Sequence, residues 1–233
     1  MQRFVSFDPA SKTLAFIIAT IDMKLFSKDI VDKHILARRL IDGSRMLINN
    51  PTLDKLETIK TFDRKLRAIY DEVRPMIHIE YGHTVDLVPG VADDDIDPIQ
   101  RTKALCMYIE SYVRPLLNGS EIVMIEFQMG PNNKSGIIAY SLMTLFYQHQ
   151  IITVQPSLKN KIAVGGNYYY IFSAKYDKSY TANKKHALAN FKAIESRYRS
   201  DIPESSDSLR GHIADAFMQI LGYYLIQASQ GEQ

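Results

Sequence analysis

Alternating apolar and polar positions at the start of the chain predict a β-hairpin. Residues 2–8 alternate and are rich in aromatic and β-branched side chains, and residues 9–12 have the composition of a turn. Residues 13–22 form a second apolar run. We therefore expect two antiparallel strands joined by a short turn.

The next segments change to helical spacing. Apolar side chains recur at three- and four-residue intervals through residues 31–74, with a break at 49–51, which predicts two helices. Residues 77–81 and 85–88 are short alternating segments that we interpret as a third strand with its partner. Residues 105–116 place apolar side chains on one face of a further helix.

The second half of the chain alternates between strand and helix patterns. An apolar run within residues 121–128 is typical of a strand buried on both faces, and residues 135–148 are apolar around most of a helix. Residues 151–154 predict the next strand. A helix over residues 183–199 is followed by stop and cap signals at Pro203, Ser205 and Asp207 and by a last helix that runs to about residue 228. This order predicts an α/β fold with a mixed β-sheet flanked by helices.

The composition describes a globular chain without a membrane segment. The 233 residues are 46% hydrophobic and 23% charged, and the longest apolar stretches are shorter than the ~20 residues needed to cross a bilayer. The first residues lack the pattern of a secretory signal, and the single cysteine, Cys106, permits neither an internal disulfide nor a multi-cysteine zinc site. We therefore expect an intracellular protein.

Charge is distributed unevenly, although the net charge is only +2. Residues 156–200 hold nine basic and two acidic side chains, and this surplus of +7 suits binding to a polyanion. Residues 86–98 gather five aspartates with proline and glycine, which we interpret as a solvated acidic loop.

Four acidic or imidazole side chains stand out by their positions in the predicted elements. Asp8 and Glu126 end strands, and an ionised carboxylate beside a core must be paired, hydrated or bound to metal. His212 and Asp215 are three residues apart near the start of the last helix, so they project together. Each has a structural alternative, since Asp before Pro is a common turn former and Asp is common at helix N-termini.

The order and context of these residues resemble one family. The relevant segments are residues 7–13, residues 125–128 with 132–135 following, and residues 212–216. Together they resemble the acidic motifs of RuvC-type Holliday junction resolvases, above all those of poxviruses and other large DNA viruses. The resemblance implies an RNase H-like fold, a homodimer, and cleavage of four-way DNA junctions by paired symmetric nicks.

The resemblance also implies a metal site. Asp8, Glu126 and Asp215 would be the ligands, and His212 stands where some members have Asp and others His. Two Mg²⁺ ions about 3.5–4 Å apart are a recurrent arrangement in nucleases, and Mn²⁺ would serve at least as well beside an imidazole. We expect Asp8 to bridge the ions and Glu126 and Asp215 to hold one each. His212 would be either a ligand or the acceptor of the proton of the attacking water.

The basic block supplies candidate contacts to DNA phosphates. Lys159 and Lys161 follow the strand over residues 151–154 and resemble lysines that the family carries near its active face. Lys184 and Lys185 are similar candidates. The three tyrosines at 168–170 either stack on opened bases or pack in a core or dimer contact. Gly165 and Gly166 lack the pattern of a phosphate-binding loop, so no nucleotide cofactor is expected.

Three functions stay open at this point. The first is resolution of four-way junctions in recombination, repair or the processing of replicated DNA, in the cytoplasm or nucleus of a host cell if the chain is viral. The second is a nuclease acting on other branched DNA or on RNA–DNA hybrids, and the third is a non-catalytic nucleic-acid-binding protein. In each case we expect a single RNase H-like domain over residues 1–233. Residues 31–98, which depart from the family pattern, would be an insertion.

Overall fold

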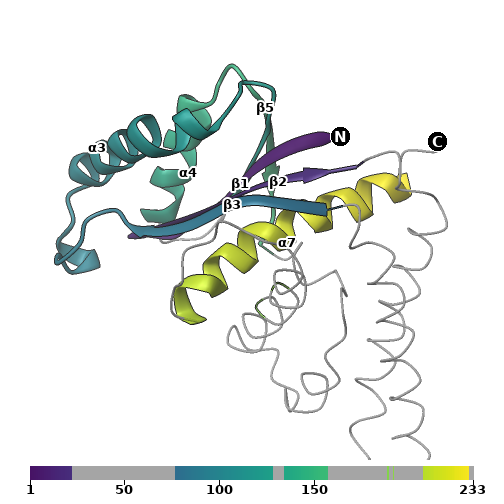
Figure 1. Cartoon of the computed structure of the whole chain (residues 1–233). Coiled ribbons are helices and arrows are strands. Elements are labelled where there is room, and N and C mark those ends of the chain that lie inside the picture. The colour runs from purple at the N-terminus through teal and green to yellow at the C-terminus, as the bar shows by residue number, and fades with distance from the viewer. Residues whose placement is uncertain (23–76, 128–133, 157–187, 189–190, 192–206, 231–233) are drawn as a thin grey trace, which may run out of the picture.

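The structure, a computed structural model, describes residues 1–22, 77–127, 134–156, 188, 191 and 207–230. These residues form a five-stranded sheet with helices on both faces (Figure 1). The strands, in their order across the sheet, are β3 (Ile77–Asp86), β2 (Thr13–Ile21), β1 (Gln2–Pro9), β4 (Ile122–Glu126) and β5 (Gln150–Val154).

The sheet is mixed, as the sequence predicts. β2 runs antiparallel to β1 and β3, whereas β1, β4 and β5 are parallel neighbours. The predicted hairpin is confirmed, and the backbone N–H of Ala10 donates to the carbonyl of Thr13 at 2.9 Å within its turn. This strand order, with helices on both faces, agrees with the RNase H-like α/β class that the motifs imply.

Residues 77–86 form one strand, so the prediction of a third strand with a separate partner is wrong. β3 pairs with β2, and the register shifts opposite the step from Ile18 to Ala19, where Glu80 is the extra residue of a β-bulge. The Glu80 carboxylate accepts hydrogen bonds from Thr20 and from Arg3 of β1. The bulge therefore turns an edge-strand carboxylate toward the middle of the sheet.

Several sequence predictions fall outside the described residues. They are the helical pair over residues 31–74 and most of the helix over residues 183–199. The range 31–98, which we expect to be an insertion, is described only from residue 77 onward. Those residues contribute β3 to the sheet.

Each face of the sheet packs against its own helices (Figure 1). α7 (Asp207–Gln230) covers one face, and α3 (Pro98–Tyr108) and α4 (Lys134–Leu145) cover the other. The side chains of β1 alternate between the two layers: Phe4 packs in the α7 layer, whereas Val5 and Phe7 pack beneath α3 and α4. Because both faces of the sheet are covered, polar side chains at the strand ends are held between packed layers.

The described helices largely match their sequence patterns. α3 begins at Pro98 because the Asp97 carboxylate caps it, accepting from the N–H groups of Ile99 at 2.8 Å and Gln100 at 3.3 Å. The helix continues through a π-helical turn, η4 (Ile109–Val113), and a 3₁₀ turn, η5 (Arg114–Leu116). The predicted face is confirmed at Leu105 and Ile109, but in the π-helical turn Val113 is buried instead of Tyr112, which is exposed. Among the described residues, the apolar length of each helix is too short to span a membrane.

Basic side chains hold the acidic segment before α3. Arg101, whose side chain is 2% exposed, donates to the carbonyl of Ser11 and, at 3.1 Å, to that of Asp93, and it pairs with the Asp93 carboxylate at 3.2 Å. Lys134, at the start of α4, pairs with Asp93 at 3.4 Å and with Asp94. We call these five residues the acidic clasp. The segment is thus anchored by ion pairs rather than merely solvated, and the clasp links the turn after β1 to the start of α4.

The acidic clasp predicts a loss of stability in acid. Burial alone would raise the pKa of Asp93, but hydrogen bonds from Ser11 and Lys134 and the charges of Arg101 and Lys134 hold it below its usual range. A carboxyl group with a lowered folded-state pKa contributes stability above its unfolded pKa of about 4, and this contribution is lost as the pH falls through the folded value. Urea midpoints measured from pH 6 to pH 3 should therefore fall less in Asp93→Asn than in the wild type.

Asp95→Asn is the matched control, because Asp95 lies in the same 3₁₀ turn, η3 (Asp93–Asp95), and is exposed. Its pH dependence should follow that of the wild type. Equal acid sensitivity in the wild type and Asp93→Asn would contradict the assignment of the clasp.

Candidate active site

Two of the sequence-predicted carboxyl groups lie at the same end of neighbouring strands. β1 and β4 are parallel, and Phe7 is in register with Ile125. Asp8 and Glu126 are the next residues of their strands, so their backbones lie side by side at a strand spacing of about 4.8 Å. By strand alternation both side chains point to the face that α7 covers, the same face as Phe4 and Met124.

α7 brings the other two predicted residues to this end of the sheet. Residues 212–222 include an apolar set buried against the sheet, with Ile213, Phe217 and Leu221 at most 1% exposed. The same stretch of α7 holds three polar residues, His212, Asp215 and Gln219. They stand at i, i+3 and i+7, which places them on one side of the helix over about 10 Å. Packing of the apolar set therefore fixes where these three polar side chains meet the strands.

Side-chain contacts join α7 to both strand carboxylates. Nδ1 of His212 lies 3.1 Å from Oδ2 of Asp8. Seven residues further along α7, Nε2 of Gln219 donates to Oε2 of Glu126 at 2.8 Å. Oγ of Ser6 donates to Oε1 of the same glutamine at 3.0 Å. Asp215 lies on the turn of α7 between these two contacts. The structure thus gathers the four sequence-predicted residues along one side of α7.

The three carboxyl groups are buried. Asp8 is 5% exposed, and Glu126 and Asp215 are each 1% exposed. Moving ionised carboxylates out of water is costly unless cations or hydrogen bonds compensate it. The side chain of His212 is 17% exposed, so the imidazole lies at the more open side of the group. Such a group favours the binding of a cation.

The donor set fits a divalent metal ion in its chemistry. Mg²⁺ and Mn²⁺ prefer carboxylate oxygens, and Mn²⁺ also accepts an imidazole nitrogen. In the arrangement observed, however, the part of the chain that the structure describes holds no cluster of three or more His, Cys, Asp or Glu side chains that could hold a metal ion. Asp8 and Glu126 instead contact His212 and Gln219. Metal binding here would therefore require each carboxylate to bind a cation alongside its hydrogen bond, which its several lone-pair sites permit.

Sequence analysis missed two residues of this group, Ser6 and Gln219. Both are fully buried. A signal for Gln219 was available, because it lies seven residues after His212 and four after Asp215, on the same side of the helix. Ser6 shares its strand face with Asp8 in the same way.

The predicted DNA contacts lie outside the described residues. This holds for the tyrosines at 168–170 and for Lys159, Lys161, Lys184 and Lys185. Their contribution stays a prediction from the sequence.

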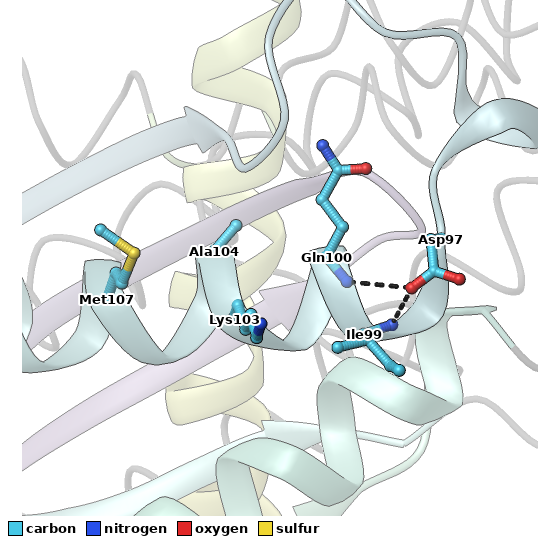
Figure 2. Close-up of a pocket in the computed structure, with 6 residues that line it drawn as sticks. All are labelled: Asp97, Ile99, Gln100, Lys103, Ala104 and Met107. Carbon is cyan, nitrogen blue, oxygen red and sulfur yellow. Dashed lines mark hydrogen bonds between the residues drawn. The ribbon is translucent and has the colours of Figure 1, made fainter.

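A surface pocket lies in the other layer of the protein, on the outer side of α3 (Figure 2). Its lining includes the exposed side chains of Ile99 and Met107, and the capping carboxylate of Asp97 lies at one end. Because α3 and α7 cover opposite faces of the sheet, this pocket is separate from the group of carboxylates.

Comparisons with known proteins give matches in structure but not in sequence. The sequence matches no family model and no curated protein. The structure is similar to fowlpox virus resolvase, solved with its substrate Holliday junction DNA, at 14% identity and a TM-score of 0.48, over 97% of this chain and 99% of that chain. It is also similar to RuvC of Thermus thermophilus at 11% identity and a TM-score of 0.48, over 98% of this chain and 97% of that chain.

A second structure of the Thermus thermophilus enzyme, in complex with a Holliday junction substrate, is similar at 14% identity and a TM-score of 0.47. That match covers 100% of this chain and 98% of the other.

Metal ions are expected to stabilise the folded protein through this site. A ligand that binds only the folded state adds about 2.7 kcal/mol at a hundredfold excess over its Kd, so Mn²⁺ or Mg²⁺ should raise the thermal unfolding midpoint relative to EDTA. Asp8→Asn, Glu126→Gln and Asp215→Asn should each reduce that rise, because each removes an anionic donor. Differential scanning fluorimetry with and without metal measures the effect.

Glu110→Gln is the control for this experiment. Glu110 is an exposed carboxylate that pairs with Arg114 in the other layer, so its loss should leave the metal-induced rise unchanged. If all three site variants kept the full rise, the metal would bind elsewhere.

Proposed function

We propose that this chain is a metal-dependent DNA endonuclease that resolves four-way (Holliday) junctions by paired symmetric nicks. The observation that carries the proposal is the meeting of three sequence motifs at one place. Asp8 of β1, Glu126 of β4 and the pair His212 and Asp215 of α7 lie along one side of α7 at the ends of two parallel strands. The order and spacing of the same motifs along the chain resemble RuvC-type resolvases.

We assign the three carboxylates as metal ligands. Asp8, Glu126 and Asp215 would together hold the Mg²⁺ ions. When bound, such ions activate a water molecule and stabilise the charge that develops on the attacking and leaving oxygens. The covered sheet and the packed α7 hold the ligands at fixed positions on rigid elements.

His212 is suited to accept a proton. An ionised carboxylate can only accept hydrogen bonds, so the nitrogen of His212 that faces Asp8, Nδ1, carries the proton. In the neutral imidazole the lone pair is then on Nε2. Asp8 therefore selects the tautomer that leaves Nε2 as a base, and a water molecule next to Nε2 could transfer its proton there.

DNA binding in this proposal depends on the basic block over residues 156–200. Its surplus of +7 contrasts with a net charge of +2 for the whole chain, so the remainder of the chain carries more acidic than basic side chains. Cationic contacts to phosphates dominate affinity for DNA. Two symmetric nicks need two active sites, and we propose that a homodimer supplies them. The setting would be recombination or the processing of replicated DNA.

The proposal is tested by a cleavage assay on defined substrates. Labelled four-way junction, linear duplex and RNA–DNA hybrid are each incubated with Mg²⁺, Mn²⁺ or EDTA. We expect paired nicks in the junction alone, only with metal, and a loss of at least about 10²-fold in turnover in Asp8→Asn, because a metal ligand is removed. Glu110→Gln, on the other side of the sheet, should cut like the wild type.

The other outcomes of this assay separate the alternatives. Cleavage of the hybrid or of other branched DNA in preference to the four-way junction would assign the same chemistry to a different substrate. Junction binding without cutting under every metal condition would contradict a nuclease and leave a non-catalytic binding protein.

The basic block gives a prediction about salt. Each lysine that binds a phosphate displaces counterions, so replacing it makes the negative slope of log Kobs against log [salt] shallower by roughly 0.9. We expect the double substitution Lys159→Ala with Lys161→Ala to reduce the magnitude of that slope by about 1–2 units in junction binding measured in EDTA. The matched control is Lys103→Ala, which removes a lysine from the outer side of α3. An unchanged slope in the double variant would exclude both residues as phosphate contacts.

A further inference from the structure

We propose that Gln219 is a positioning residue for Glu126 and that Ser6 in turn orients Gln219. The inference rests on the proposed function, because it treats Glu126 as a metal ligand. The basis is a continuous chain of hydrogen bonds from Ser6 of β1 through Gln219 of α7 to Glu126 of β4.

The chain of hydrogen bonds is enclosed by the fold. Ser6 and Gln219 are each 0% exposed and Glu126 is 1% exposed, and the three residues come from three different elements. The two bonds measure 3.0 Å and 2.8 Å, within the ordinary range for such groups. Because water is largely excluded, each bond is stronger than on the surface, and each partner is costly to remove.

The direction of both hydrogen bonds follows from chemistry. The carboxylate of Glu126 can only accept while it is ionised, so the amide nitrogen of Gln219 must face it. The amide oxygen then faces Ser6, whose hydroxyl has to donate. Ser6 therefore fixes the orientation of the amide, and the oriented amide presents an N–H to Glu126.

A glutamine at this position is otherwise unfavourable for packing. Its neighbours Met218 and Ile220 are fully buried and belong to the apolar core of the α7 layer. A buried amide costs free energy unless it is hydrogen-bonded, and a methionine or leucine would fill the same space without that cost. The hydrogen bonds of the amide with Ser6 and Glu126 compensate the free-energy cost of its burial.

Glu126 keeps capacity for a metal ion in this arrangement. A carboxylate has about four lone-pair sites, so acceptance of one N–H at Oε2 still permits coordination of a cation. The amide is neutral, and it can hold the plane of the carboxylate without repelling a divalent ion as a lysine or arginine would. Outer partners of this kind typically contribute about 10- to 100-fold to metal affinity or activity.

The experiment compares Gln219→Met, Ser6→Ala and the double variant with the wild type. Methionine keeps the length of the side chain and removes the donor. We measure the Kd for Mn²⁺ alone by electron paramagnetic resonance, turnover on a four-way junction, and the thermal midpoint in EDTA. Gln219→Met should weaken Mn²⁺ binding about 10- to 100-fold and lower turnover, while junction affinity in EDTA stays unchanged.

Ser6→Ala should change the same quantities in the same direction by a smaller factor. In the double variant the loss should equal that of Gln219→Met alone, because Ser6 acts through the amide. Ile220→Val is the matched control, since it trims the core at the next residue of α7 and should lower the thermal midpoint without changing the Kd for Mn²⁺.

The outcomes separate this inference from the proposed function. If the wild type cuts junctions and Gln219→Met binds Mn²⁺ as tightly as the wild type, the positioning role is wrong while the nuclease stands. If Gln219→Met does not fold, Ser6→Ala decides, and an unchanged Kd for Mn²⁺ overturns the inference. A wild type that neither binds Mn²⁺ nor cuts any junction overturns the proposed function itself.

Discussion

The packing of α7 across β1 and β4 is the constraint on which the candidate site depends. Asp8 and Glu126 become neighbours through strand pairing alone, but the remaining polar groups reach them only because one helix lies over both strands. The apolar side chains of α7, among them Ile213 and Phe217, interlock with the core that also holds Phe4. A helix shifted by one turn would move about 5.4 Å and separate both side-chain contacts at once.

Carboxylates at the two ends of the parallel strands have different kinds of partner. At the start of β1, Arg3 pairs with Glu80 at 2.8 Å and with Glu121, so a guanidinium lies between two carboxylates. At the other end, an imidazole and a neutral amide contact Asp8 and Glu126. The first arrangement links three strands and the segment before β4. The second leaves a surplus of negative charge that an added cation would balance.

Periodicity predicted most of the described fold because the elements bury whole faces. The hairpin, β4, α4, β5 and α7 all follow from local patterns of apolar side chains. β3 shows where this fails, since its apolar residues alternate regularly in the sequence across Glu80, whereas the bulge places Ile79 and Tyr81 in opposite layers. The clasp around Asp93 was not visible either, because its partners Arg101 and Lys134 are brought to it by the tertiary fold.

Some residues of the candidate site can likewise be predicted from local sequence, and others only from contacts between distant segments. Acidic residues at strand ends can be recognised from the sequence, whereas the pairing of Gln219 with Glu126 joins residues far apart in the chain and needs the tertiary structure. Its chemistry also bears on how a site can be both ordered and able to bind metal. A lysine or arginine there would hold Glu126 firmly but would compete with a divalent ion for the same charge. A neutral donor orients the carboxylate and adds no such repulsion, and this favours an amide over a cation beside a metal ligand.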